Sequence, residues 1–184
     1  MKTIQHFVDG KSFAGESKKS GKVFNPATGE QSAEVKLAST KDVNTAVDSA
    51  KKAFESWSNK PPLQRARVMF KFKELIEKNS KELTEIIVSE HGKVFEDARG
   101  SLNRGLEVVE YACGIPEMLK GDFTENVGTN VDSWSIRQPL GVCAGITPFN
   151  FPAMVPMWMF PIAIACGNTF VLKPSEKDPT CSMK

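Results

Sequence analysis

Two short polar segments have residue types that could bind a nucleotide, and each directly follows an apolar run. They are residues 147–150 and residues 173–176. A carboxylate after the second strand of a nucleotide-binding unit often binds ribose hydroxyls, as Glu176 could, and Lys173 beside it could reach a hydroxyl or a phosphate. The sequence has no GxGxxG motif. By themselves, these residues therefore indicate dinucleotide binding only weakly.

The elements that must position these segments follow a strand, helix, strand pattern. The apolar runs 141–147 and 169–172 are short and do not alternate, which is typical of buried strands in a parallel sheet. A helix is predicted over residues 153–166, with Pro152 at its first position and Gly167-Asn168 as its stop signal. Such a unit is a right-handed βαβ crossover, and ligands bind beyond the carboxyl ends of its strands. The two polar segments fall at those ends.

The connecting helix is apolar enough to raise a second interpretation. Residues 151–167 contain no polar side chain, as in a membrane-spanning helix. Prolines at positions 152, 156 and 161 argue against such a span, although kinked membrane helices tolerate proline. The sequence has no second candidate span. We therefore expect a buried core helix.

The elements before this unit are predicted from periodicity and turn signals. Residues 4–37 are expected to form short strands, with a hairpin turn at Asp9-Gly10 and a strand exposed on one face at residues 32–37. Two helices are expected next, one from Thr40, which can cap it, to Trp57, and one over 63–79 that buries Val68, Phe72, Leu75 and Ile76. Two more helices are expected over 81–90, capped by Ser80, and over 95–119. A loop over 116–128 and an extended segment over 131–139 complete the predicted elements.

Composition excludes several classes of function. The chain is 40% hydrophobic and 25% charged, and 24 basic against 22 acidic residues leave a net charge of +2. This balance gives no broad field for nucleic acid or anionic membranes. The four cysteines contain no C-x-x-C pair and only two histidines exist, so we expect no metal site. Cys143 and Cys166 are expected to be buried thiols, which fits a reducing cytoplasm.

Two motifs identify a family. The strings Pro148-Phe149-Asn150-Phe151-Pro152 and Lys173-Pro174-Ser175-Glu176 resemble the PWNFP and KPSE motifs of the aldehyde dehydrogenase superfamily. Phe149 in place of Trp, together with residues 157–161, is most similar to the CoA-acylating branch that acts on malonate and methylmalonate semialdehyde. The resemblance covers nearly the whole chain and implies an α/β fold, the N-terminal part of the family's Rossmann-like parallel sheet with flanking helices.

The resemblance also implies how the chain is divided. Residues 1–120 would be the N-terminal part of the NAD-binding domain, residues 121–139 a segment of the sheet that joins subunits, and residues 140–184 the NAD-binding βαβ unit. The catalytic domain would be absent, because family members are more than twice this length. Since the resemblance begins almost at Met1, without a signal or transit segment, we expect a bacterial cytoplasmic protein.

The resemblance assigns roles to two polar residues outside the cofactor site. The Asn150 carboxamide would donate to the oxyanion; on pattern alone it could instead cap the turn between strand and helix. Arg104 would anchor the second carboxylate of the substrate, since arginine pairs bidentately with carboxylates. The alternative is that Arg104 only pairs with Glu107 or Glu110.

Five residues would contact the cofactor by resemblance. Thr147 and Phe149 would border NAD, while Lys173 and Glu176 would hold its adenosine ribose, with Lys177 close enough to help. Without the family, Glu176 and Lys177 would be an ordinary exposed pair.

The implied reaction is oxidation of malonate or methylmalonate semialdehyde with NAD and CoA, giving an acyl-CoA and CO₂. None of the four cysteines has the sequence context of the family's nucleophile, so we expect the chain alone to be inactive and the full-length protein to be a tetramer or dimer. Two alternatives stay open. One is the hydrolytic branch, which releases a free acid; the other is a non-catalytic nucleotide-binding or assembly module. The sequence leaves open which of the two semialdehydes is preferred.

Overall fold

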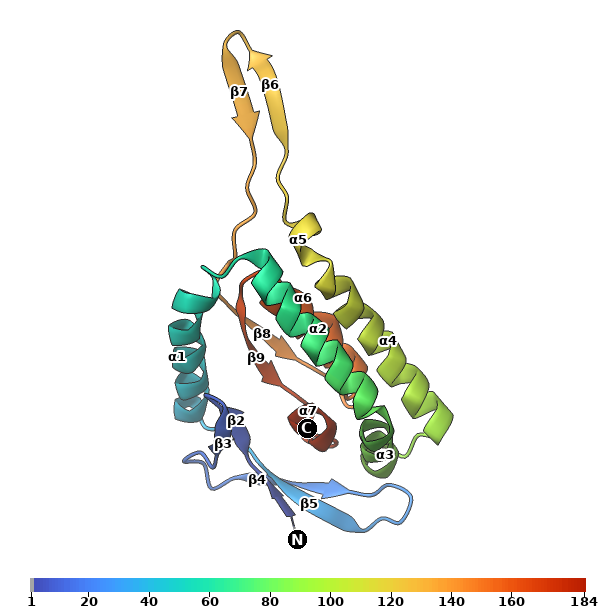
Figure 1. The fold of residues 1–184 in the computed structure, drawn as a ribbon. Coiled ribbons are helices and arrows are strands. Elements are labelled where there is room, and N and C mark those ends of the chain that lie inside the picture. The colour runs from blue at the N-terminus through green and yellow to red at the C-terminus, as the bar shows by residue number, and fades with distance from the viewer. Residues whose placement is uncertain (1) are drawn as a thin grey trace.

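The two apolar runs pair as parallel strands in the computed structural model, which describes residues 2–184 (Figure 1). Strand β8 (Val142–Ile146) lies in register with β9 (Thr169–Lys173), and helix α6 (Met154–Ala165) connects them. The predicted βαβ unit is therefore confirmed. One detail was wrong: Ala153 is the N-cap of α6, so Pro152 precedes the helix and does not occupy its first position.

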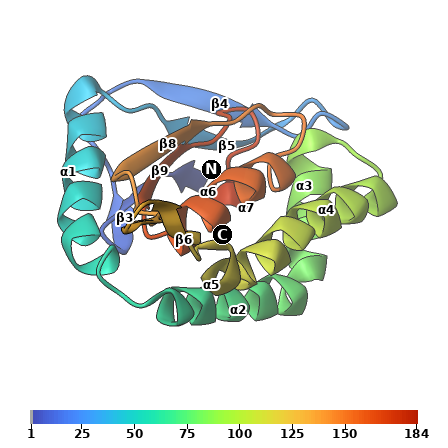
Figure 2. The same ribbon diagram turned by 90° about the horizontal axis from the view of Figure 1, so that it is seen from above.

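The strand pair is covered by helices on both faces. Helix α1 (Thr40–Trp57) packs on one face and α6 on the other, as Figure 2 shows. Outside α6 lie α2 (Pro62–Lys78), α3 (Ser80–His91) and α4 (Phe95–Cys113). The main core forms where α3, α4 and α6 meet, and its buried members are Leu83, Ile87, Ala98, Leu102, Val109, Ala153, Met157 and Cys181.

Two helix starts differ from their predictions. Ser39, and not Thr40, caps α1: its hydroxyl accepts from the Asp42 backbone N–H, and the Asp42 carboxylate accepts from the Ser39 N–H at 2.8 Å, which completes a capping box. Ser80 is the first helical residue of α3 and does not cap it. The Ser80 carbonyl instead accepts from the hydroxyl of buried Thr84.

The buried face of α2 is rotated relative to its prediction. Phe72 and Ile76 pack against the core, but Val68 and Leu75 are exposed and Met69 is buried in their place. Helix α2 packs against α4 and α6 and leaves these two apolar side chains exposed. The long helix predicted over 95–119 is interrupted at Gly114 and continues as the short helix α5 (Ile115–Met118).

The N-terminal strands form two small sheets. Strand β5 (Gln31–Lys36) lies between β1 (Lys2–Ile4), which is parallel to it, and β4 (Ser20–Phe24), which is antiparallel. Strands β2 (His6–Val8) and β3 (Lys11–Phe13) form the predicted hairpin. Its turn residues, Asp9 and Gly10, have φ values of 54° and 75°, as a tight two-residue turn requires. The one-sided burial of residues 32–37 is also confirmed, because Ala33 and Val35 are buried.

A second hairpin projects from the body of the molecule (Figure 1). It consists of β6 (Phe123–Gly128) and β7 (Val131–Trp134), and every residue of both strands is exposed. The prediction of a loop over residues 116–128 was therefore wrong. Residues 123–128 have no alternation of apolar and polar types that would have predicted a strand, whereas the extended segment predicted over 131–139 does contain β7.

The apolar segment 151–167 forms a core helix. Helix α6 has 12 residues, about 18 Å of length, which is well short of the roughly 30 Å hydrocarbon layer of a bilayer. Within residues 2–184, no helix is both long and apolar enough to span a membrane. The last element, α7 (Thr180–Met183), follows β9 and packs against α3.

Candidate functional site

The two polar segments meet at one edge of the strand pair, as predicted. The Thr147 N–H donates to the Lys173 carbonyl at 3.1 Å, directly beyond the last strand pair, Ile146 and Lys173. Thr147 itself is buried, whereas Phe149 and Asn150 are exposed. The carboxyl ends of the parallel strands therefore present side chains to a ligand from both loops.

Asn150 has a free carboxamide. Helix α6 has no side-chain cap, and among the described residues no group hydrogen-bonds to the Asn150 side chain, so the structure does not support the turn-cap alternative. The backbone of Asn150 is held instead: its carbonyl accepts from Lys93 Nζ at 2.7 Å. The amide is thus available to donate to a ligand from a turn that is fixed by its main chain.

The second loop carries an ion pair and a cation–π contact. Lys173 Nζ lies 2.8 Å from Glu176 Oε2, and this hydrogen bond lowers the pKa of the Glu176 carboxyl below its usual value. Lys177 Nζ lies 4.3 Å from the centre of the Phe149 ring, so a residue of the β9 loop contacts one of the β8 loop. Glu176 is an ionised acceptor at neutral pH.

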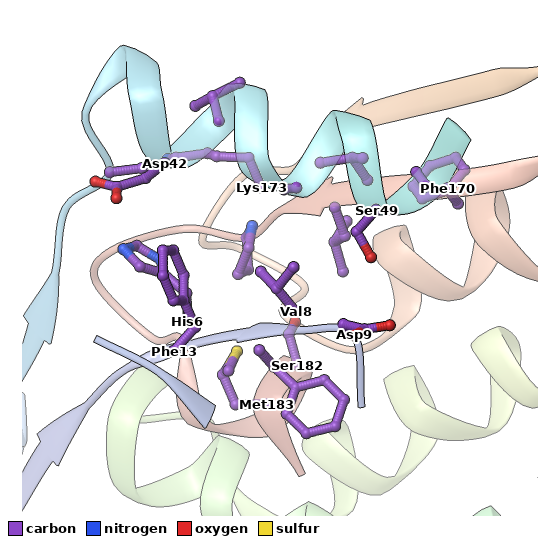
Figure 3. A pocket seen from close by; sticks show the side chains of 18 of the residues that line it. His6, Val8, Asp9, Phe13, Asp42, Ser49, Phe170, Lys173, Ser182 and Met183 are labelled. Carbon is purple, nitrogen blue, oxygen red and sulfur yellow. The ribbon is translucent and has the colours of Figure 1, made fainter. Parts of the chain in front are cut away.

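A cavity of about 730 Å³ opens beside the second loop. Lys173 and Glu176 line it, together with side chains from the β2–β3 hairpin, α1, β9 and α7 (Figure 3). Most of the cavity wall is apolar, as in sites for small organic molecules. Other predicted site residues do not line this cavity; these are Thr147, Phe149, Asn150, Lys177 and Arg104.

Arg104 lies on α4 and is exposed. It forms no ion pair with Glu107 or Glu110 among the described residues, so the purely structural alternative is not observed. Its positive charge lies near enough to Lys93 to contribute to lowering the pKa of that ammonium, although burial of Lys93 is the larger cause. The charge of Arg104 therefore acts on the lysine that contacts the turn with Asn150.

Sequence analysis missed a buried carboxyl group near both loops. Asp178 is 1% exposed, and neither of its oxygens has a hydrogen-bond donor among residues 2–184. Burial, with Glu90 nearby, raises its pKa to about 7. In sequence Asp178 follows an exposed Lys and precedes Pro179, a pattern typical of a surface loop, so no local signal indicated burial.

Sequence analysis also missed the contacts made by the end of α3. The Glu90 carboxylate accepts from the Thr180 N–H at 3.0 Å and from the Thr180 hydroxyl. Lys93 contacts the other loop through the Asn150 carbonyl and the ring of Phe151, whose centre is 3.7 Å away. The partners are 90 and 57 residues apart in sequence, so only the fold brings them together.

Three of the four cysteines, Cys113, Cys166 and Cys181, have surroundings that disfavour the thiolate. All four thiols are free. Burial raises the pKa of Cys181 to about 12 and also raises the pKa of Cys113 and Cys166. The expectation of full burial was wrong for Cys143 and Cys166, which are half-buried. Over the described range 2–184, no group of three or more possible ligands could hold a metal ion.

Comparison with known proteins gives a consistent result. The profile of the aldehyde dehydrogenase family matches residues 13–184. A malonate-semialdehyde dehydrogenase of Pseudomonas aeruginosa is 54% identical over 183 residues, which are 100% of this chain and 37% of that protein. An acylating, mitochondrial methylmalonate-semialdehyde dehydrogenase of Arabidopsis thaliana is 55% identical over 161 residues, 88% of this chain and 26% of that protein.

A solved structure is similar along the whole chain. It is that of a protein from Sinorhizobium meliloti assigned as a methylmalonate-semialdehyde dehydrogenase and crystallised with NAD. It superposes with a TM-score of 0.97 at 53% identity, and the match covers 100% of this chain and 37% of that one. The chain therefore spans little more than a third of the length of these relatives.

Proposed function

The chain belongs to the aldehyde dehydrogenase family, and on this premise we propose that it is the N-terminal part of an NAD-dependent, CoA-acylating dehydrogenase of malonate or methylmalonate semialdehyde. The observation that carries the proposal is the shared edge of β8 and β9, where a free Asn150 carboxamide and the Lys173–Glu176 pair stand at adjacent strand ends. The nucleophilic cysteine would be supplied by the remainder of the enzyme.

Asn150 would stabilise charge during the first chemical step. A cysteine thiolate attacks the aldehyde carbon, and the carbonyl oxygen becomes an oxyanion. A carboxamide suits this position because it donates a hydrogen bond without carrying a charge of its own, and a fixed donor needs no reorganisation during the reaction. Asn150 meets both requirements, since its amide is free and its backbone is held by Lys93.

The residues of the second loop fit an adenosine ribose. Glu176 is ionised and exposed, so its carboxylate can accept from two hydroxyls, and Lys173 can donate to a ribose oxygen. The adjoining cavity is apolar and large enough for a nucleoside. Thr147, Phe149 and Lys177 would border the cofactor between the two loops. When bound, NAD would supply the hydride acceptor that an aldehyde oxidation requires.

Arg104 would bind the carboxylate at the far end of the semialdehyde. Arg104 is exposed, forms no ion pair among the described residues, and its charge acts on Lys93, which contacts the Asn150 turn. A free guanidinium near the oxyanion donor could orient a substrate that carries a second carboxylate.

We also propose the division of the chain that the family implies. Residues 1–120 and 140–184 would belong to the NAD-binding domain, and the projecting hairpin within residues 121–139 would join subunits into a tetramer or dimer. The exposed Phe123 and Trp134, paired across β6 and β7, support this role because they offer an apolar face to a partner subunit. Four free thiols support a cytoplasmic location.

The test is a product analysis of the natural-length protein, purified and incubated with NAD, CoA and either semialdehyde. We expect NADH together with propanoyl-CoA from methylmalonate semialdehyde or acetyl-CoA from malonate semialdehyde, identified by mass spectrometry. NADH with a free acid, formed at the same rate without CoA, would instead support the hydrolytic branch. Absence of NADH with every aldehyde would support a non-catalytic module.

A further inference from the structure

The C-terminal end of α3 connects the two loops of the candidate site. Gly92, which lies between Glu90 and Lys93 in the chain, ends the helix in the left-handed conformation, with φ of 83°. Glu90 accepts two hydrogen bonds from Thr180, after β9, and Lys93 donates one to the Asn150 carbonyl, after β8. One helix end therefore contacts both loops.

The contact of Lys93 with Asn150 is the more informative of the two. Among residues 2–184, Lys93 is the only hydrogen-bond donor to the Asn150 carbonyl, because the first helical bond of this region goes to Phe151 and not to Asn150. The Lys93 ammonium also lies 3.7 Å from the centre of the Phe151 ring. Two neighbouring residues of the turn are thus held by one side chain.

Lys93 is placed so that it has few other partners. It is half-buried, and the charged groups around it are Asp97, Arg104 and buried Asp178, with none of which it forms an ion pair among the described residues. Its hydrogen bond to a main-chain carbonyl is therefore the specific polar contact that its position provides. A lysine with no role beyond solubility would extend into solvent.

We propose that Lys93 is a positioning residue that acts through Asn150, holding the turn so that the Asn150 carboxamide is in place before the oxyanion forms; this inference rests on the proposed function. A hydrogen-bond donor lowers the barrier only when it points to where charge develops, and an error of about 1 Å can cost a large factor in rate. Residues 148–150 are exposed, so removal of Lys93 frees the segment that must stay fixed.

The experiment compares Lys93→Met in two backgrounds of the natural-length enzyme, with Asn150 intact and with Asn150→Ala. Met keeps the apolar stem and removes the donor. With Asn150 present, we expect kcat/KM for the semialdehyde to fall about tenfold, less than for loss of the carboxamide itself. In the Asn150→Ala background we expect a change of less than about twofold, because residues that act through one another are not additive.

Two further variants separate positioning from general damage. Lys93→Arg retains a donor and a cation over Phe151, so it should restore kcat/KM to within about threefold of the parent enzyme. Lys81→Met removes an 84% exposed lysine from α3, the helix that ends just before Lys93, and should leave kcat/KM unchanged. The KM for NAD should stay constant in both Lys93 variants, because Lys93 does not line the cavity beside Glu176.

Equal losses in the two backgrounds, or failure of Lys93→Arg to restore activity while its melting temperature is unchanged, would overturn the inference. If Lys93→Met does not fold, Lys93→Leu, which also lacks a donor, is compared with Lys93→Arg in the same two backgrounds. The parent enzyme tests the proposed function separately, because that proposal fails if the parent forms no NADH. If the parent is active but the losses from the Lys93 and Asn150 substitutions are additive, only the role of Lys93 is refuted.

Discussion

At the scale of single residues, the site depends on side chains whose polar groups are left without protein partners. The Asn150 carboxamide is exposed and free, and the Asp178 carboxyl is buried and equally without a donor. The two cases differ in consequence. An exposed free amide is available to a ligand at little cost, whereas a buried carboxyl without donors prefers to stay protonated.

Replacement of Asn150 by Ala should lower kcat/KM of the natural-length enzyme by about 100- to 1000-fold, because one oxyanion donor is lost. NAD affinity should be unchanged, since Asn150 does not line the cavity beside Lys173 and Glu176. Steady-state kinetics and NAD titration check both statements. Asn103→Ala, an exposed asparagine on α4, is the matched control. A loss of NAD binding equal to the loss of activity would contradict the assigned role.

Asp178→Asn should stabilise the protein at high pH more than at low pH. The folded-state pKa of Asp178 is raised to about 7 from an ordinary value of 3.8, so the folded state binds a proton that the unfolded state releases. Stability contributed by this proton is fully present below about pH 4 and is lost as pH rises through about 7. Asn cannot ionise, so this loss disappears.

Melting temperatures at pH 5 and pH 8 measure the effect of Asp178→Asn. The variant should exceed the parent protein clearly at pH 8 and by much less at pH 5, where only part of the stability has been lost. Asp48→Asn serves as control, because the Asp48 side chain is 75% exposed. An equal shift at both pH values would show that Asp178 is ionised throughout.

At the scale of elements, the site is positioned by the close approach of α4 to α6. A Cβ on Gly105 would lie 3.1 Å from the Cα of Met154 and would also overlap the Met157 side chain. Helix α6 begins directly after the Asn150 turn, so the depth at which α4 lies against it sets the position of that turn. Sequence periodicity alone treats Gly105 as an ordinary break in helix propensity.

Gly105→Ala should destabilise the protein by about 1–3 kcal/mol, because the added methyl group forces backbone to move in a packed contact. Gly100→Ala is the matched control in the same helix: a Cβ there meets nothing within 4 Å. Since Ala has the higher helix propensity, the control should gain about 0.5–1 kcal/mol. Chemical denaturation of both variants measures the two free energies of unfolding. If both substitutions changed stability by a similar amount in the same direction, close packing at Gly105 would not be the cause.

At the scale of the whole molecule, a hairpin, a cavity and a strand edge are left uncovered within residues 2–184. The hairpin β6–β7 is exposed on both faces, and the cavity beside β9 is largely apolar. The outer edge of β9 has no strand partner within residues 2–184. An open strand edge favours association with another chain.

Phe123→Asp combined with Trp134→Asp should prevent subunit assembly of the natural-length protein, because two charges replace the apolar pair on one face of the hairpin. The matched control is Thr124→Asp with Ser133→Asp, the neighbouring pair on the opposite face. Light scattering after size-exclusion chromatography measures the mass. Assembly that survives in the first variant, or fails equally in both, would contradict a role for the apolar face.

Elements with local signals were predictable from the sequence. Apolar runs, helix stops and the Asp9-Gly10 turn predicted the βαβ unit, the β2–β3 hairpin and the helices, because period and turn chemistry are written in neighbouring residues. The motif residues Asn150, Lys173 and Glu176 fell at the correct strand ends for the same reason. Burial faces were less predictable, as Val68 and Leu75 illustrate, because they depend on which helix lies opposite.

Features that join distant segments became visible only in the folded chain. The contacts of Glu90 and Lys93 cross 90 and 57 residues, and the burial of Asp178 results from the packing of α3 against the C-terminal loop. Strand β6 was missed because its own residues show no apolar period, whereas β7 in the same hairpin was predicted as extended. Local sequence specifies the conformation of each segment, but the environment of a side chain is set by neighbours that the chain brings close only when it folds.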